Sequence, residues 1–130
     1  MPEFRSAFSG ISVNDLEEAR RFYGEALGLP VRDEMGGLRV DLPESAPLWV
    51  YSKDDHEPAT FTVLNFIVSD IDRAVDELNA AGVSTKIYED GQFWTDDKGI
   101  ARGRSANRGP DIAWFKDPAG NVLAVIQPGD

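Results

Sequence analysis

The sequence contains no cysteine and only one histidine, so residues that commonly bind metals or act as nucleophiles are scarce. The lack of cysteine excludes disulfides, thiolate metal sites and cysteine nucleophiles. No apolar run approaches the roughly 20 residues needed to cross a bilayer, and the N-terminus lacks the apolar core of a signal peptide. We therefore expect a cytoplasmic protein that does not bind membranes.

Basic residues are also few, with 13 Lys and Arg against 23 Asp and Glu, which gives a net charge of −10. This charge opposes binding to nucleic acid, because such binding depends on basic side chains that neutralise phosphates. The 130 residues are 42% hydrophobic and 28% charged. These values predict one globular domain over residues 1–130.

The chain contains an internal repeat. Residues 11–28 read ISVNDLEEARRFYGEALG, and residues 66–82 read FIVSDIDRAVDELNAAG. Four pairs of similar or identical residues lie 55 positions apart: Val13 and Val68, Asp15 and Asp70, Leu16 and Ile71, and Ala19 and Ala74. Each copy has a β-rich run, an aspartate able to cap a helix, an amphipathic segment and a glycine. The repeat predicts two modules, at about 5–54 and 59–128, with a ligand site at their seam.

Both modules are predicted to have the element order βαβββ, which makes the fold class α+β. In the first, a strand over 7–13 and a helix that ends at Gly28 precede three strands, with a hairpin turn at Gly36-Gly37. In the second, we expect a strand over 60–68, a helix from Asp70 to Gly82, and strands in VSTKIYE, DIAWFK and NVLAVIQ. The polar segment 90–109 is predicted to be a long loop with a binding role.

Three stretches resemble the glyoxalase/bleomycin-resistance/dioxygenase superfamily, also called vicinal oxygen chelate: NDLEEARRFYGEALGLP, SDIDRAVDELNAAGV and AWFKDPAGNVLAVIQ. The resemblance covers nearly the whole chain. It implies that the two βαβββ modules form a curved, incomplete barrel around a cleft. In enzymes of this family, a divalent metal held by His and Glu side chains acts as a Lewis acid.

The positions that match the usual metal ligands of the family are Phe8, Trp49, Val63 and Ala124. None of these side chains can coordinate a metal. The only histidine, His56, lies in the acidic stretch KDDHEPAT, where a solvated side chain is expected. We therefore expect no metal, no cofactor and no catalytic residue of the metal-dependent kind.

The same positions predict an apolar and aromatic lining of the cleft, because residues two apart in a strand share a face. The expected ligand-binding residues are Phe8, Ser12, Trp49, Tyr51, Val63, Asn65, Trp94, Ile112, Trp114 and Ala124. Four basic residues, Lys98, Arg102, Arg104 and Arg108, fall within eleven positions. They could hold an anionic group of a ligand, or they could simply balance nearby acids such as Asp96, Asp97 and Asp111.

The leading hypothesis is a metal-free protein that binds an apolar or aromatic small molecule in the inter-module cleft, as a homodimer. Two alternatives remain open. One is a glyoxalase-type lyase or isomerase, or a dioxygenase-like enzyme, with non-standard metal ligands. The other is a structural or regulatory module in which aromatic side chains fill the cleft.

Overall fold

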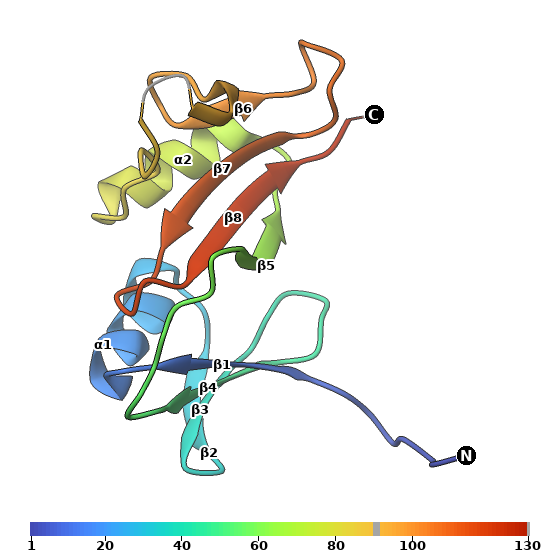
Figure 1. Ribbon diagram of the computed structural model, residues 1–130, viewed down its shortest axis with the longest axis vertical. Coiled ribbons are helices and arrows are strands. Elements are labelled where there is room, and N and C mark those ends of the chain that lie inside the picture. The colour runs from blue at the N-terminus through green and yellow to red at the C-terminus, as the bar shows by residue number, and fades with distance from the viewer. Residues whose placement is uncertain (90–91, 130) are drawn as a thin grey trace. The chain divides into compact units, whose positions relative to one another are not determined.

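The computed structural model describes residues 1–89 and 92–129, and it consists of two compact units. The first unit is Met1–Pro58, and the second begins at Ala59. Each unit contains a four-stranded sheet, and each sheet remains open in the described part of the chain (Figure 1). The α+β class and the two similar modules are therefore confirmed. Among the described residues, the helices are too short or too polar to cross a membrane.

The first unit follows the predicted order of elements. Its elements are β1 (Ser9–Val13), α1 (Leu16–Arg21), the π-helical turn η1 (Phe22–Ala26), β2 (Val31–Glu34), β3 (Gly37–Val40) and β4 (Leu48–Ser52). The strand order is β1-β4-β3-β2, with β1 parallel to β4 and the other pairs antiparallel. The hairpin turn between β2 and β3 is Met35-Gly36, one residue earlier than predicted, and both residues have positive φ.

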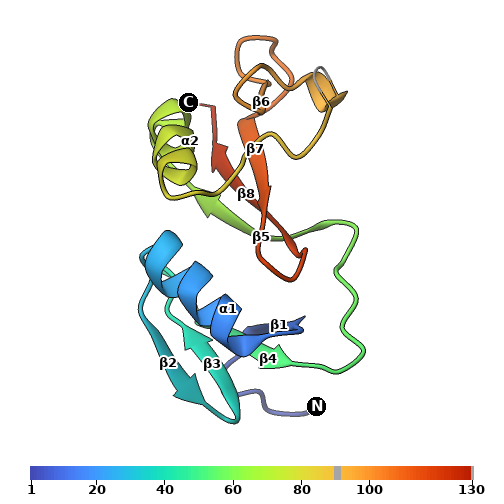
Figure 2. The ribbon, with the colours of Figure 1, turned by 90° about the vertical axis from the view of Figure 1, so that its left-hand side faces the viewer.

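The second unit repeats this topology. Its elements are β5 (Thr62–Ile67), α2 (Ile71–Ala80), the short 3₁₀ turn η2 (Gln92–Trp94), β6 (Ile100–Arg102), β7 (Asp111–Lys116) and β8 (Val122–Gln127). The strand order β5-β8-β7-β6 matches that of the first unit position by position. In Figure 2, α2 lies along one face of this sheet. That face is the core, with Val75, Phe115 and Leu123 fully buried.

Both predicted helix caps are confirmed. The Asp15 carboxylate accepts hydrogen bonds from the backbone N–H groups of Glu17 and Glu18, at 3.0 and 3.1 Å. The Asp70 carboxylate accepts one from Arg73 N–H at 3.1 Å. These bonds satisfy donors that the first helical turn leaves without partners. The recurring aspartates thus start the two helices at equivalent points of the repeat.

The strand predicted at VSTKIYE is wrong. Residues 83–89 pair with no strand in the described part of the chain, and the sheet edge beside β7 is formed by β6, inside the predicted loop. Val83 and Thr85 are buried while Ser84 and Lys86 are exposed, so the alternation that suggested a strand is real. The Thr85 hydroxyl, however, donates to the Lys98 carbonyl at 2.7 Å. That side-chain bond holds the segment outside the sheet ladder.

A network of charges fastens β6 to α2. The Arg102 guanidinium donates to both carboxylate oxygens of Asp72, at 2.7 and 2.9 Å, and also to Asp96 at 3.0 Å. Lys98 pairs with Asp72 at 3.1 Å and with Asp76 at 2.9 Å. Asp96 is among the acids that the sequence suggests as partners of the basic residues, whereas Asp72 and Asp76 of α2 are not. Lys98 and Arg102 thus have a structural role.

The ion pairs of Asp72 predict that the free energy of unfolding decreases at acidic pH. The hydrogen bonds from Arg102, followed by those from Lys98, hold the pKa of Asp72 well below its usual range. A lowered pKa stabilises the fold above the unfolded-state value of about 3.9, and this contribution is lost as the pH falls below that value. We expect Asp72→Asn to be less stable than wild type by about 1 kcal/mol at pH 7, a figure that allows for the exposure of the side chain. Urea unfolding at several pH values should show this gap narrowing below pH 4; a constant gap would contradict the assignment.

Candidate functional site

The face of the second sheet that points away from α2 carries several of the predicted site residues. Strand register places Asn65 of β5, Ala124 of β8 and Trp114 of β7 in one row across it. Ile67, Ile126 and Ile112 form the next row. We call this the open face. It contains four of the predicted ligand-binding residues, and they share one surface because the strands are in register.

The pairing of β5 with β8 does not place Val63 on the open face. Thr62 pairs with Val122 and Leu64 pairs with Leu123, so β5 has one extra residue at this point. Val63 is that residue, and such a β-bulge interrupts the alternation of side chains. The predicted position of Val63 in the cleft requires a regular strand there, and β5 is irregular between Thr62 and Leu64.

Aromatic side chains gather around Trp114. Its ring centroid lies 5.5 Å from that of Tyr88 and 5.9 Å from that of Phe93. Tyr88 and Phe93 also meet edge to face, with centroids 4.7 Å apart. Such offset and edge contacts are the favoured geometries for aromatic pairs. Tyr88 was missed as a site residue because it lay in the predicted strand; the only signal was the density of aromatic residues between 88 and 94.

A cavity of about 410 Å³, which we call the aromatic pocket, lies beside this cluster. Its floor is Ile112 and Trp114 of the open face, and its walls come from η2, β6 and the β6–β7 loop. The lining residues are Phe93, Trp94, Ala101, Gly103, Arg108, Pro110, Ile112 and Trp114. The volume is within the usual range for pockets that bind small molecules. Three predicted residues, Trp94, Ile112 and Trp114, are thus brought together.

One edge of the aromatic pocket is a cation–π contact. The guanidinium carbon of Arg108 lies 3.9 Å from the centre of a Trp94 ring, and Trp94 is 66% exposed. Phe93 and Trp94 have φ values of 56° and 61°, a left-handed conformation that costs a non-glycine residue about 1–2 kcal/mol. The ring contacts with Tyr88, Trp114 and Arg108 act against this cost. Strained residues held in this way are common at ligand sites.

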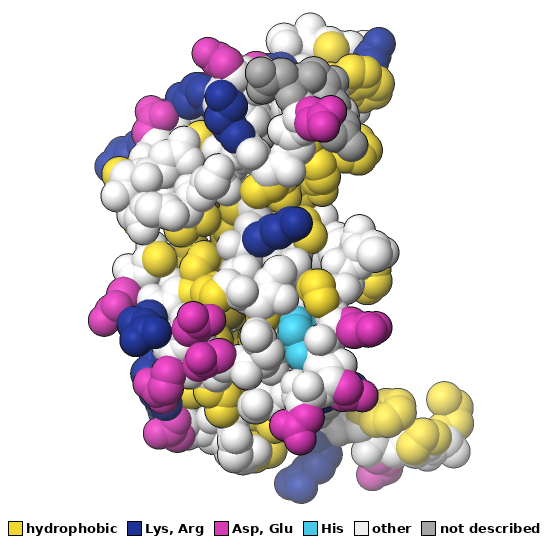
Figure 3. All heavy atoms as spheres, turned by 60° about the vertical axis from the view of Figure 1, so that its left-hand side comes forward, with side chains coloured by type: hydrophobic (Ala, Val, Ile, Leu, Met, Phe, Trp, Pro, Cys, Tyr) yellow, Lys and Arg dark blue, Asp and Glu magenta, His cyan; other side chains and the backbone are white. Residues whose placement is uncertain are grey.

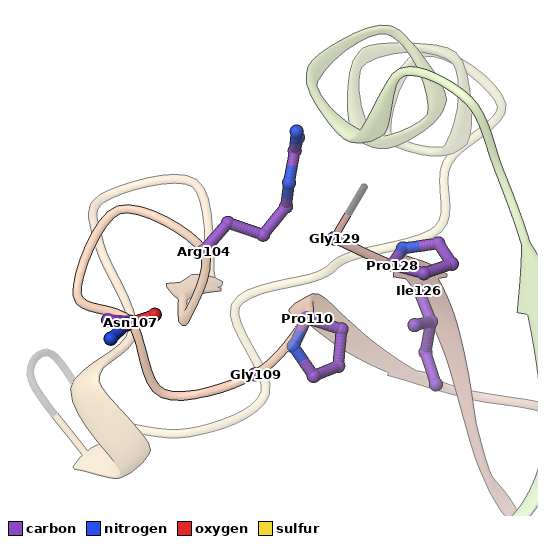
Figure 4. Close-up of a pocket in the computed structure, with 7 residues that line it drawn as sticks. All are labelled: Arg104, Asn107, Gly109, Pro110, Ile126, Pro128 and Gly129. Carbon is purple, nitrogen blue, oxygen red and sulfur yellow. The ribbon is translucent and has the colours of Figure 1, made fainter.

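A second, larger groove is lined by the β6–β7 loop together with Ile126 and the C-terminal segment. Its volume is about 560 Å³, and Pro110 borders both cavities. Figure 4 shows the Arg104 side chain extending away from Asn107, and Pro128 and Gly129 of the C-terminal segment line the same groove. Arg104 and Arg108, four residues apart, therefore serve different surfaces.

The first sheet also has a face with aromatic side chains. Register places Gly10 of β1 beside Trp49 of β4, and Ser12 beside Tyr51. The Trp49 and Tyr51 rings stack with centroids 4.7 Å apart, and the Trp49 indole N–H donates to the Glu34 carbonyl at 3.1 Å. Three predicted site residues, Ser12, Trp49 and Tyr51, thus share one face of the first unit.

The remaining predicted residue of this unit, Phe8, precedes β1 rather than lying within it, and it is 51% exposed. His56 is not merely solvated, as had been expected. It is partly buried, and its Nδ1 lies 2.7 Å from Ser12 Oγ in a hydrogen bond. The histidine side chain, drawn in cyan in Figure 3, is visible at the surface. Ser12 had been proposed as a polar ligand contact, and its hydroxyl has this partner within its own unit.

The family assignment follows from comparison with known proteins. The model of the Glyoxalase/Bleomycin resistance protein/Dioxygenase superfamily matches residues 6–125. This chain belongs to that superfamily. The match includes both copies of the repeat, so the resemblance noted from the sequence is confirmed. No curated protein sequence matches the chain significantly.

Solved structures share the fold of this superfamily member. A putative glyoxalase family protein from Bacillus anthracis is 21% identical, with a TM-score of 0.67 over 99% of this chain and 100% of its own. A glyoxalase/bleomycin resistance protein/dioxygenase from Alicyclobacillus acidocaldarius is 19% identical, with a TM-score of 0.70 over 100% and 96%. TnmS3, an antibiotic binding protein from Streptomyces sp. CB03234, is 24% identical, with a TM-score of 0.60 over 99% of each chain.

The metal implied by the resemblance does not fit the residues present. The four matching positions carry a phenyl ring, an indole and two aliphatic side chains, none of which is a metal ligand. Ala124 is fully buried, and the Trp49 nitrogen already donates to a carbonyl. Within residues 1–89 and 92–129, no group of three His, Asp or Glu side chains is arranged to hold a metal ion.

Proposed function

We propose that this superfamily member is a metal-free binding protein for an apolar or aromatic small molecule. The observation that carries the proposal is the aromatic pocket, whose floor is Trp114 and Ile112 and whose wall includes Phe93. Indole and phenyl faces bind planar ligands through stacking and through burial of apolar area. The predicted contacts in the first unit, and those at Val63, Asn65 and Ala124, remain part of the proposal.

The lack of a donor set supports the metal-free part of the proposal. A catalytic zinc site, for example, uses three protein ligands to position the metal ion against the substrate. The described residues supply no such group, whereas they do supply an apolar surface. Binding through this surface requires no reactive side chain.

The test is a titration of the protein with 2-naphthamide, a neutral planar compound, in buffer treated with EDTA. We expect saturable quenching of tryptophan fluorescence with one site per chain. A thermal shift should accompany it, because ligand at 100 times its Kd stabilises the native state by about 2.7 kcal/mol. The proposal is overturned if no saturable binding occurs, or if binding requires an added divalent metal.

The proposal also includes a homodimer, which the family resemblance implies. Size-exclusion chromatography with light scattering should then give twice the mass of one chain. A mass equal to one chain at micromolar concentration would remove this part and leave the ligand proposal intact.

A further inference from the structure

Among the described residues that line the aromatic pocket, Arg108 is the one with a charged side chain. Among the described residues, Arg108 pairs with no carboxylate and lies on the Trp94 ring. Lys98 and Arg102 in the same segment do have acidic partners. Lys98 pairs with Asp72 and Asp76, and Arg102 pairs with Asp72 and Asp96. The aromatic pocket therefore contains a positive charge that no carboxylate of residues 1–89 and 92–129 neutralises.

The position of Arg108 leaves its hydrogen-bond donors available. A guanidinium has five N–H groups in one plane, in a fork that matches the two oxygens of a carboxylate. Contact with an indole face uses the π surface of the guanidinium and not these donors. Arg108 can thus bind an acid while it stays near Trp94.

We infer that the ligand of the aromatic pocket is a planar aromatic acid. Its ring system packs against Trp114 and Phe93, and its carboxylate accepts hydrogen bonds from Arg108. This inference rests on the proposed function and specifies the class of ligand. Phe93 and Trp94, both with positive φ, line the aromatic pocket together with Arg108. One ligand can therefore contact both the aromatic rings and the guanidinium.

The net charge of −10 opposes this inference at long range, because it repels anions. At physiological ionic strength, however, such repulsion between exposed charges is screened over about 8 Å. A direct pair with Arg108 acts at hydrogen-bond distance and is screened much less. The local contact therefore decides the selectivity of the pocket, and the net charge mainly slows the approach of an anion.

The experiment compares 2-naphthoate with 2-naphthamide, which have the same ring and differ in charge. Calorimetry on wild type should show the acid binding about tenfold more tightly or better. Arg108→Gln should abolish this preference, so that the acid and the amide bind with similar affinity. Arg108→Lys should restore part of the preference, because lysine keeps the charge but loses the planar fork. Arg104→Gln, the same charge change in the same loop, should behave as wild type.

Each other outcome contradicts the inference in a distinguishable way. Equal binding of the two compounds by wild type would refute the aromatic acid and leave the proposed function standing. Equal losses for both compounds in Arg108→Gln would show that Arg108 only shapes the pocket. A loss in Arg104→Gln as large as that in Arg108→Gln would show that net charge, and not contact, sets the preference. If neither compound binds, the proposed function itself fails.

Discussion

Replacement of Trp114 by alanine is expected to weaken the binding of 2-naphthamide by about 30-fold or more. Trp114 is the largest side chain on the floor of the aromatic pocket, and Tyr88 and Phe93 both contact it. Alanine at this position removes the stacking surface, and the rings of Tyr88 and Phe93 lose the contact that orients them. A loss above 2 kcal/mol, typical of a central aromatic residue at a binding site, corresponds to this factor.

The matched variant is Trp114→Phe, which keeps an aromatic face at the same place. We expect it to bind within about fivefold of wild type, because stacking tolerates a smaller ring. Circular dichroism and thermal melting should show that both variants are folded. The site would be misassigned if Trp114→Ala, properly folded, bound 2-naphthamide as tightly as wild type does.

Replacement of Gly99 by alanine should destabilise the fold by more than about 3 kcal/mol. Gly99 has a φ of +84°, which disfavours any side chain, and a Cβ there would overlap the carbonyl oxygen of Thr85. The obstacle is backbone, and the adjacent Thr85–Lys98 hydrogen bond holds it in place. Strain and overpacking therefore add, as in the most destabilising single substitutions.

Gly82 provides the control for this prediction. Its φ of +86° is nearly the same, but an added Cβ would meet nothing within 4 Å. Gly82→Ala should therefore cost only about 1 kcal/mol. Urea unfolding of both variants separates the two contributions. Similar losses would mean that the contact between Gly99 and Thr85 is not tight in solution, and that the segment 83–89 is less firmly held than described.

The repeat predicted most of the fold, because local and tertiary signals agree in it. Asp15 and Asp70 cap helices, Gly28 and Gly82 follow them, and the apolar strands take equivalent places in two sheets. The prediction failed where two segments competed for one sheet edge. Residues 83–89 have the alternation of a strand, but the Thr85 hydroxyl bonds to a backbone carbonyl, and Ile100–Arg102 pairs with β7 instead.

The site was predictable where it depends on strand register and not where it depends on loops. The count that placed Trp114 and Ala124 on one face holds, since the two residues are paired in β7 and β8. The same count fails at Val63, because one extra residue in β5 cannot be seen in the sequence. The contacts of Tyr88 and Arg108 depend on the backbone of long connections. Asp72, the partner that Lys98 and Arg102 share, lies on α2, 26 and 30 residues away in sequence.

We propose that the aromatic pocket binds a planar ligand without a metal. A crystal structure of the protein grown with 2-naphthoate in the presence of EDTA tests it most directly. We expect the naphthyl ring to lie against Trp114 and the carboxylate on Arg108, with no metal between the ligand and the protein. A ligand bound through a metal ion, or a pocket left empty while the compound binds at another place, would contradict it.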